Sequence, residues 1–243
     1  MIRIGTAGWA IPAQYRERFA TSGSVLERYA RVLNVVEINT SFYRHHQAQT
    51  FERWAASVPR GFRFSVKVPR ELTHEGELTP DRRVLDRFAE EVAGLGGKLG
   101  VLLVQLPPSL VFDAAAATRF FKAVRKRVDV PLALEPRHAS WGSPLAERLL
   151  ARSRIARVAA DPAPWVGAEA PAGNADLAYF RWHGSPRKYY SDYDAERLAN
   201  LKRHVSAIAR KGADAWVIFD NTAHGHALGN ALSLKAPQRR QAK

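Results

Sequence analysis

Short apolar segments alternate with longer amphipathic segments along the whole chain. The apolar segments are rich in valine, isoleucine, leucine and phenylalanine, and turn-forming residues bound them, which is typical of buried strands in a parallel sheet. We predict strands at residues 2–8, 35–39, 62–68, 100–106, 131–137, 155–161, 177–183 and 215–221.

The segments between these strands repeat their apolar positions with a period near 3.6 residues, which predicts amphipathic helices. They are residues 24–33, 48–58, 80–95, 114–128, 143–153 and 194–211. The stretch that follows the sixth predicted strand, up to Gly173, is rich in proline and glycine. Both residues disfavour a helix interior, so we expect a loop there.

Strands that alternate with helices predict an α/β fold, and 243 residues suit one eight-stranded βα barrel. An open, doubly wound sheet is the alternative, but it usually carries a glycine-rich dinucleotide turn after its first strand. Here the first strand runs into "GTAGWA", with Trp9 and Pro12 where a helix would begin. No linker or internal repeat divides the chain. We therefore predict a single (β/α)8 TIM-barrel-like domain over residues 1–236, followed by a basic, disordered tail at 237–243.

Polar residues end most of the predicted strands, and their spacing places them on one face. Residues two apart on a strand share a face, so the Phe and Val positions of residues 62–68 point outward while Ser65 and Lys67 point inward. Barrel enzymes carry their active sites at the carboxyl ends of the strands. We expect one polar cup lined by Glu37, Asn39, Lys67, Gln105, Glu135, Arg137, Tyr179, Arg181, His183 and Asp220.

The strand-end motifs resemble the YecE-like family, also called domain of unknown function 72. The matching pieces are "GTAGW" (5–9), "VEINTSFY" (36–43), "FRFSVKVPRELTH" (62–74), "LGVLLVQLPPSL" (99–110), "LEPRHASW" (134–141), "YFRWHGSPRKYYSDY" (179–193) and "FDNTAHGHALGNA" (219–231). They cover nearly the whole chain in order. The resemblance implies a TIM-barrel-like fold and no particular activity.

Glu135 and Arg137 form the first candidate pair. Glu135 could act as a general acid or base while Arg137 holds an anionic group, and the structural alternative is an ion pair that closes the top of the barrel. Lys67 could serve as a Schiff-base amine or an electrostatic stabiliser if burial lowers its pKa. Its structural alternative is a pairing with Glu37 or Glu135.

The segments after the seventh and eighth strands are where barrels often bind phosphate. Arg181, His183 and the amides near Gly184 could hold a phosphate or carboxylate group, or Arg181 could only neutralise Asp220 or Glu135. Asn221 or Thr222 is the candidate N-cap of the last helix.

Further candidates lie on the rim of the cup. His74 could reach over it as an acid–base residue, or remain a solvated loop histidine. Tyr43, Trp141, Tyr189 and Tyr190 could stack on a sugar ring or a base, or simply pack the loops over the barrel mouth.

The net charge of +14 attracts polyanions. The basic residues, however, are spread through amphipathic segments, which favours a solvated surface over a dedicated nucleic-acid face. No apolar run approaches the ~20 residues of a membrane span. The N-terminus lacks a signal-peptide pattern. The absence of cysteine excludes disulfides and thiolate chemistry and suits a cytoplasmic location.

A metal site needs converging His, Asp and Glu side chains. Candidates are Glu37, Glu135, Asp161, His183 and Asp220. The inward Lys67, Arg137 and Arg181 would repel a divalent cation, so we predict neither a metal nor another cofactor.

The favoured hypothesis is an enzyme, hydrolase- or lyase-like, that acts on a small anionic or phosphorylated, possibly sugar-like substrate. Glu135 would be the acid or base with Lys67 and His183 assisting, and Arg137 and Arg181 would hold the anion. The alternatives are a nucleic-acid-binding or metal-dependent endonuclease-like barrel and a binding barrel without turnover.

Overall fold

The apolar segments form the strands that their pattern predicts. The computed structural model describes residues 1–236, so the predicted tail at 237–243 lies outside the described residues. The strands are β1 (Ile2–Ala7), β2 (Val35–Ile38), β3 (Arg63–Lys67), β4 (Leu99–Gln105), β5 (Leu132–Glu135), β6 (Ile155–Arg157), β7 (Ala159–Asp161), β8 (Ala172–Gly173), β9 (Leu177–Trp182) and β10 (Asp214–Phe219).

One sheet contains all of these strands, in the order β7-β9-β10-β1-β2-β3-β4-β5-β6-β8. Strands β6 and β7 follow each other directly along the chain and are separated only by Val158. Because β6 pairs with β5 and β7 pairs with β9, this interrupted sixth strand closes the sheet into a barrel. The pairings around the ring are parallel, and only the two-residue β8 runs antiparallel, against β6. The barrel fold is confirmed.

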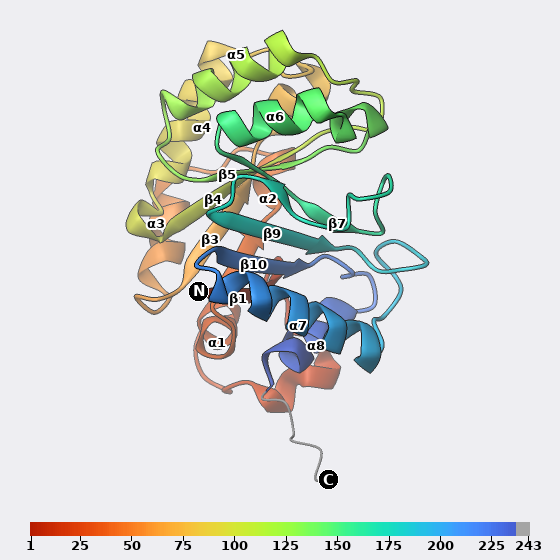
Figure 1. The fold of residues 1–243 in the computed structure, drawn as a ribbon. Coiled ribbons are helices and arrows are strands. Elements are labelled where there is room, and N and C mark those ends of the chain that lie inside the picture. The colour runs from red at the N-terminus through yellow and green to blue at the C-terminus, as the bar shows by residue number, and fades with distance from the viewer. Residues whose placement is uncertain (237–243) are drawn as a thin grey trace.

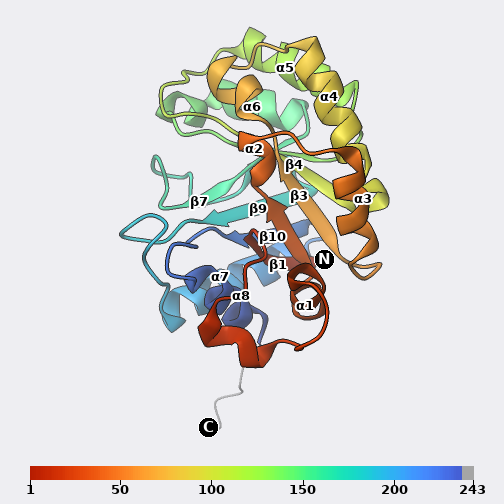
Figure 2. The same cartoon turned by 180° about the vertical axis from the view of Figure 1, so that it is seen from behind.

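The helices surround the sheet. They are α1 (Val25–Val32), α2 (Thr40–Tyr43), α3 (Ala48–Ala56), α4 (Arg82–Ala93), α5 (Ala114–Arg125), α6 (Pro144–Arg152), α7 (Ala195–Arg210) and α8 (His226–Lys235), with short helical turns η1 (Ala13–Arg18), η2 (Glu71–Glu75), η3 (Gly96–Lys98) and η4 (Ala139–Gly142). Helices α3 to α6 lie on one side of the strands and α1, α7 and α8 on the other (Figures 1 and 2).

Local sequence explains where most helices begin. Ser24 and Glu27 form a capping box at α1, and Asp81, Asp113 and Asp194 accept backbone N–H groups at the starts of α4, α5 and α7. Such caps satisfy backbone donors that have no partner within the helix. Helix α8 differs, because its N-cap is Gly225 with φ of +78°. The expectation that Asn221 or Thr222 caps the last helix is therefore wrong.

Two apolar clusters show the alternation of side chains along the strands. The larger one lies between the sheet and the helices and includes Phe64, Val66 and Phe180. The smaller one fills the barrel interior with Val35, Val101, Leu103, Ala133, Ala156, Val158, Leu177, Tyr179, Trp216 and Ile218. Residues of the same parity continue this interior toward the carboxyl ends of the strands, where the polar side chains are.

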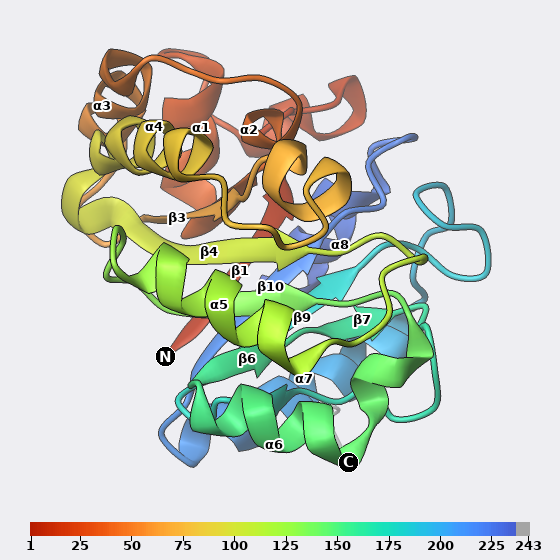
Figure 3. The same ribbon diagram turned by 90° about the horizontal axis from the view of Figure 1, so that it is seen from above.

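The connection between β9 and α7 projects at the end of the barrel toward which the strands point (Figures 1 and 3). It spans residues 183–194 and carries Lys188 and Tyr189. The expected loop before β9 is irregular apart from the short strand β8. Among residues 1–236, no helix has the length and apolar character that a membrane crossing requires.

Candidate functional site

The polar side chains predicted to meet do form one buried cluster at the carboxyl ends of the strands, and this cluster is called the cup. Glu37 from β2, Lys67 from β3, Glu135 from β5 and Arg181 from β9 all carry the inward parity, and Asp220 follows β10 directly. Their hydrogen bonds cross the barrel rather than run along one strand. The side chains of this cup are almost fully buried, so their charges interact through protein rather than through solvent.

Arg181 is the centre of the cup. Its Nη1 donates to Glu135 Oε2 at 2.6 Å, its Nη2 to Glu37 Oε1 at 2.7 Å and to Asp220 Oδ2 at 3.0 Å, and its Nε to Glu37 Oε2 at 3.0 Å. Burial alone would lower the pKa of Arg181, but the three carboxylates raise it well above its ordinary value. Arg181 is thus a permanent cation whose charge is neutralised by Glu37, Glu135 and Asp220. This arrangement matches the structural alternative given above, in which Arg181 neutralises Asp220 or Glu135.

Glu135 is held as a fixed negative charge. Burial alone would raise its pKa, yet the guanidinium groups of Arg137 and Arg181, together with His183, hold the pKa well below the ordinary value. Arg137 Nη2 lies 2.7 Å from Glu135 Oε1. A carboxylate with such a low pKa is a poor general acid or base near neutral pH, so the geometry favours a positioning role for Glu135.

His183 lies between two carboxylates. Its Nε2 is 2.8 Å from Glu135 Oε1 and its Nδ1 is 3.0 Å from Asp220 Oδ2. Arg137 Nη2 also lies 3.0 Å from His183 Nε2. Nε2 therefore faces both an acceptor and a donor.

The floor of the cup is the hydroxyl of Tyr179. It donates to Glu37 Oε2 at 2.8 Å and lies 2.8 Å from Ser65 Oγ. Burial and the charge of Glu37 raise the pKa of Tyr179 well above its ordinary value, so the phenol stays neutral. This layer separates the charged cup from the apolar barrel interior below.

Lys67 differs from the other charged residues of the cup. Its side chain is 6% exposed, and within residues 1–236 no hydrogen bond or salt bridge engages its ammonium group. The Nζ atom instead lies 3.8 Å from the centre of the Phe42 ring. Burial, then the charge of Arg181, lower the pKa of Lys67 to about 8, although the nearby carboxylates oppose this. The structural alternative for Lys67, a salt bridge with Glu37 or Glu135, does not form.

Arg137 also keeps part of its hydrogen-bonding capacity free. Its Nε atom is buried, and no partner for it is present in the described part of the chain. A buried guanidinium with an unused donor costs free energy unless a ligand or water satisfies it.

Lys188 and Tyr189 lie beside the cup in the β9–α7 connection. The sequence predicted Tyr189 as a rim aromatic residue but did not identify Lys188. Burial, then the charge of Arg137, lower the pKa of Lys188 to about 8. Tyr189 has φ of +70°, which is unfavourable for a side chain of this size. Its N–H donates to the carbonyl of His183, and its ring lies edge-on, 5.8 Å from the His183 ring. Such strain in a backbone segment is common at functional sites.

Three further predicted residues lie beside the cup. His74 packs edge-on against the Phe42 ring at 4.9 Å, and burial with the charge of Lys67 lowers its pKa. Asn39 precedes α2, and its buried Oδ1 has no partner within residues 1–236. Gln105 ends β4 beside Glu135 in the strand register and is half-buried.

The remaining predicted residues do not share one environment. Tyr43 is 73% exposed and Tyr190 is 39% exposed, which leaves both available on the rim. Trp141 is fully buried, packs against Phe112 and donates its Nε1 to the Leu110 carbonyl, so it packs a loop. Asn221 is also buried and ties the β9–α7 connection to α8 through Ser191 and Asn230. Trp141 and Asn221 therefore each have packing or loop-tying contacts of their own, while the buried Oδ1 of Asn221 has no partner within residues 1–236.

The carboxylates of the cup are directed at Arg181, which occupies the position that a bound cation would need. Among the described residues, no group of three or more His, Asp or Glu side chains has the arrangement of a metal site. This arrangement can offer a ligand hydrogen bonds and fixed charges. Within residues 1–236, Lys67 has no salt bridge and the Nε of Arg137 has no partner, so these two groups can contact a ligand.

Comparisons with known proteins agree with the fold. YunF of Bacillus subtilis, named a UPF0759 protein, is 27% identical over 267 aligned residues that cover 96% of this chain and 93% of YunF. YecE of Escherichia coli K12, another UPF0759 protein, is 31% identical over 107 residues, which cover 44% of this chain and 38% of YecE.

Solved structures show the same architecture. A DUF72 protein from Enterococcus faecalis superposes with a TM-score of 0.84 at 24% identity, covering 97% of this chain and 94% of that one. A DUF72 protein from Thermotoga maritima gives a TM-score of 0.79 at 25% identity, covering 97% and 98%. The family model described as "Protein of unknown function DUF72" matches residues 3–243. With this match over almost its full length, the chain belongs to the DUF72 family.

Proposed function

We propose that this protein is an enzyme, hydrolase- or lyase-like, that binds a small anionic or phosphorylated substrate at the carboxyl-terminal mouth of the barrel. The observation that carries this proposal is an excess of positive charge in a buried cup. The cations are Lys67, Arg137, Arg181 and Lys188, and the carboxylates are Glu37, Glu135 and Asp220.

The excess positive charge lies on basic side chains whose ion pairs or hydrogen bonds are incomplete. Arg181 is neutralised by three carboxylates, whereas Lys67 has no ion pair within residues 1–236 and Arg137 has an unused Nε donor. The pKa of Lys67 and that of Lys188 are both lowered to about 8, first by burial and next by a neighbouring arginine. An anion placed among these groups would supply the missing charge and stabilise both ammonium ions.

The proposed roles follow from the contacts. Arg137 and Lys67 hold the anionic group, and Lys188 completes the binding from the loop. His183 transfers the proton, because Glu135 and Asp220 fix the orientation of its ring and its Nε2 lies beside Nη2 of Arg137, the residue that holds the anion. Arg181 and Glu135 act as fixed charges. Tyr43 and Tyr190 on the rim offer flat surfaces to a sugar-like substrate.

Binding of phosphate tests the proposal most directly. We expect inorganic phosphate, titrated calorimetrically, to bind the wild type and to lose about tenfold or more in affinity in Arg137→Gln, since a charge-assisted hydrogen bond contributes about 1.5–3 kcal/mol. Arg119→Gln removes the same charge from an exposed position on α5 and serves as the matched control.

The affinity should also depend on pH in a defined direction. Above pH 8 Lys67 and Lys188 lose their protons, so phosphate binding should weaken as the pH rises from 7 to 9. Equal affinities of wild type and Arg137→Gln, or no binding of phosphate or of any phosphorylated metabolite in a broad thermal-shift screen, would reject the proposal. A ligand that binds but is never turned over, with His183→Gln unchanged in every assay, would identify a binding barrel without catalysis instead.

A further inference from the structure

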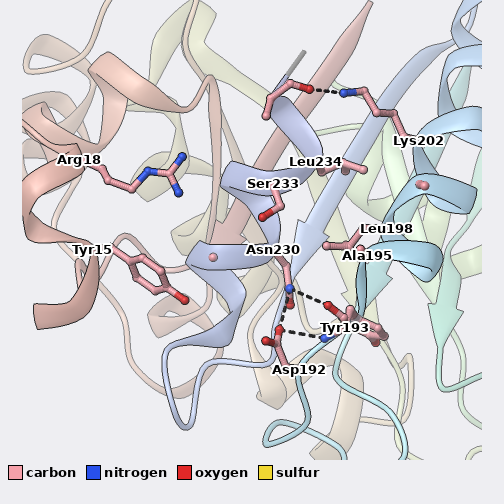
Figure 4. Close-up of a pocket in the computed structure, with 13 residues that line it drawn as sticks. Tyr15, Arg18, Asp192, Tyr193, Ala195, Leu198, Lys202, Asn230, Ser233 and Leu234 are labelled. Carbon is pink, nitrogen blue, oxygen red and sulfur yellow. Dashed lines mark hydrogen bonds between the residues drawn. The ribbon is translucent and has the colours of Figure 1, made fainter. Parts of the chain in front are cut away.

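A cavity of about 400 Å³ lies outside the polar cup, between η1 and the helices α7 and α8 (Figure 4). Leu198 and Leu234 give it an apolar floor. Arg18 reaches it from η1, and Lys202 lies on the opposite wall (Figure 4). Its volume lies in the range of about 300–1,000 Å³ that is usual for small-molecule sites.

Gly229 indicates that the shape of this cavity is built into the fold. It lies inside α8, where glycine costs roughly 0.5–1 kcal/mol relative to alanine. A Cβ at this position would be 2.2 Å from the hydroxyl oxygen of Tyr15. The absence of a side chain on Gly229 therefore allows Tyr15 to lie against α8 with its hydroxyl in the cavity wall.

The far wall is fixed by buried hydrogen bonds. Asn230 is 3% exposed and donates to Asp192 Oδ1 at 2.7 Å, while Asn221 donates to Asn230 Oδ1 at 2.8 Å and to the Ser191 carbonyl at 2.9 Å. These bonds join α8 to the β9–α7 connection just before α7 begins. The wall is thus preorganised, which reduces the cost of binding.

Several polar groups in the wall have no partner among residues 1–236; of these, Arg18 and Ser233 are exposed and Tyr15 is half-buried. Within residues 1–236, no hydrogen bond or salt bridge engages the side chains of Tyr15, Arg18 or Ser233. Lys202 donates to the Ala236 carbonyl, so its positive charge is not balanced by a carboxylate there. The only carboxylate that lines the described cavity is that of Asp192, which already accepts from Asn230 and lies 3.5 Å from His226 Nδ1.

We infer that this cavity is a second binding site, separate from the cup, for a small organic anion with a short apolar body. The anionic group lies between Arg18 and Lys202, within reach of the hydroxyls of Tyr15 and Ser233. The apolar body lies on Leu198 and Leu234. A doubly basic cavity with an apolar floor favours an anion over a neutral ligand of the same shape, because only the anion gains Coulomb attraction from both cations.

Hexanoate and its neutral analogue hexanamide are suitable probes. In ¹H–¹⁵N NMR titrations of the full chain, hexanoate should shift the amides of residues 195–202 and 229–236 and bind about tenfold more tightly than hexanamide. Arg18→Gln should weaken hexanoate binding about fivefold or more and leave hexanamide binding unchanged, consistent with loss of one charge-assisted contact.

Two control variants separate this site from others. Arg16→Gln removes the same charge from the same short helix at an exposed position outside the cavity and should have no effect. Arg137→Gln, which alters the cup, should also leave hexanoate binding intact, so failure of the cup proposal would not affect this one. Equal affinities for the two probes, absence of shifts on α7 and α8, or equal effects of Arg16→Gln and Arg18→Gln would each overturn the inference.

Discussion

The two ends of the barrel interior treat charge in opposite ways. At the amino end, Trp216 stacks on Tyr179, and its Nε1 donates to Asp214 at 3.0 Å. The cations beside Asp214 are Arg3, with its Nε 3.4 Å from Oδ2 and its guanidinium over the Trp216 ring, and the N-terminal ammonium group, 3.9 Å from Oδ1. Both face one carboxylate whose side chain is 39% exposed, so solvent screens these charges. At the carboxyl end, four cations share three carboxylates, and the Lys67 ammonium group lies over the Phe42 ring with no salt bridge to them within residues 1–236.

The difference separates groups that stabilise the fold from groups held ready for a ligand. Stability is served by closed pairs and filled space, whereas a site needs charges that the protein itself leaves incompletely balanced. Tyr179 and Ser65, which form the floor of the cup, lie between the charges at the amino end and those at the carboxyl end. Variants at the two ends should therefore affect stability in different ways.

The largest effect is expected for Arg181→Met. This change leaves the carboxylates of Glu37, Glu135 and Asp220 buried without their shared cation, and it should lower the free energy of unfolding by about 3–5 kcal/mol. The same substitution at the amino end, Arg3→Met, should cost about 1 kcal/mol or less, because Asp214 is partly exposed. Urea denaturation at pH 7 measures both. Equal losses would show that the cup is not a special charge cluster.

Lys67→Met should change the free energy of unfolding in the opposite direction and stabilise the protein. A pKa of about 8 in place of 10.5 means that burying the ammonium ion costs up to about 3 kcal/mol at neutral pH. Removing it should raise the free energy of unfolding by about 1–3 kcal/mol while weakening phosphate binding. A variant that is less stable than the wild type would contradict the assignment of Lys67 as an unbalanced cation.

The pH dependence of this difference has a fixed direction. The unfolded chain binds the Lys67 proton more tightly than the folded chain, so the penalty is complete below pH 8 and disappears as the pH rises toward 10.5. The stability advantage of Lys67→Met over the wild type should therefore shrink between pH 7 and pH 9.5. Paired urea titrations at both pH values measure the change.

A smaller effect than that of Arg181→Met is expected from a change in packing at the amino end. In Gly100→Ala the new Cβ would lie 2.5 Å from Cη2 of Trp216, so the packing must shift, at a cost of about 1–2 kcal/mol. Gly61→Ala is the matched control, because a Cβ there meets nothing within 4 Å. Thermal denaturation should show a lower Tm for Gly100→Ala only, and phosphate binding should remain unchanged in both variants.

Much of the barrel was predictable because its strands repeat one rule. Along each strand, alternate positions are apolar, and the positions between them become polar near the carboxyl end. This pattern locates Glu37, Lys67, Glu135 and Arg181 from the sequence alone. The break of the sixth strand at Val158 was not predictable. It arises because the two halves of this strand pair with different neighbours, which depends on how the ring closes.

The loops account for most of what the sequence could not place. Trp141 and Asn221 follow strands as the rim residues do, yet they are buried, since contacts with Phe112 and Asn230 decide their positions. Lys188 and Tyr189 reach the cup because the β9–α7 connection folds back over it, with Tyr189 at positive φ. Hydrophobic periodicity contains no information on such a path. Family resemblance could locate the cup but not its charge balance.

The position of Arg181 has a consequence for assembly of the barrel. Its three carboxylate partners come from the first, the middle and the last third of the chain, at residues 37, 135 and 220. Neither half of the barrel alone contains all four groups, so neither half can neutralise them. The ring therefore closes in the same step in which the charges at its centre are neutralised. We expect the strands of the ring to form and melt as a single cooperative unit rather than as two half-barrels.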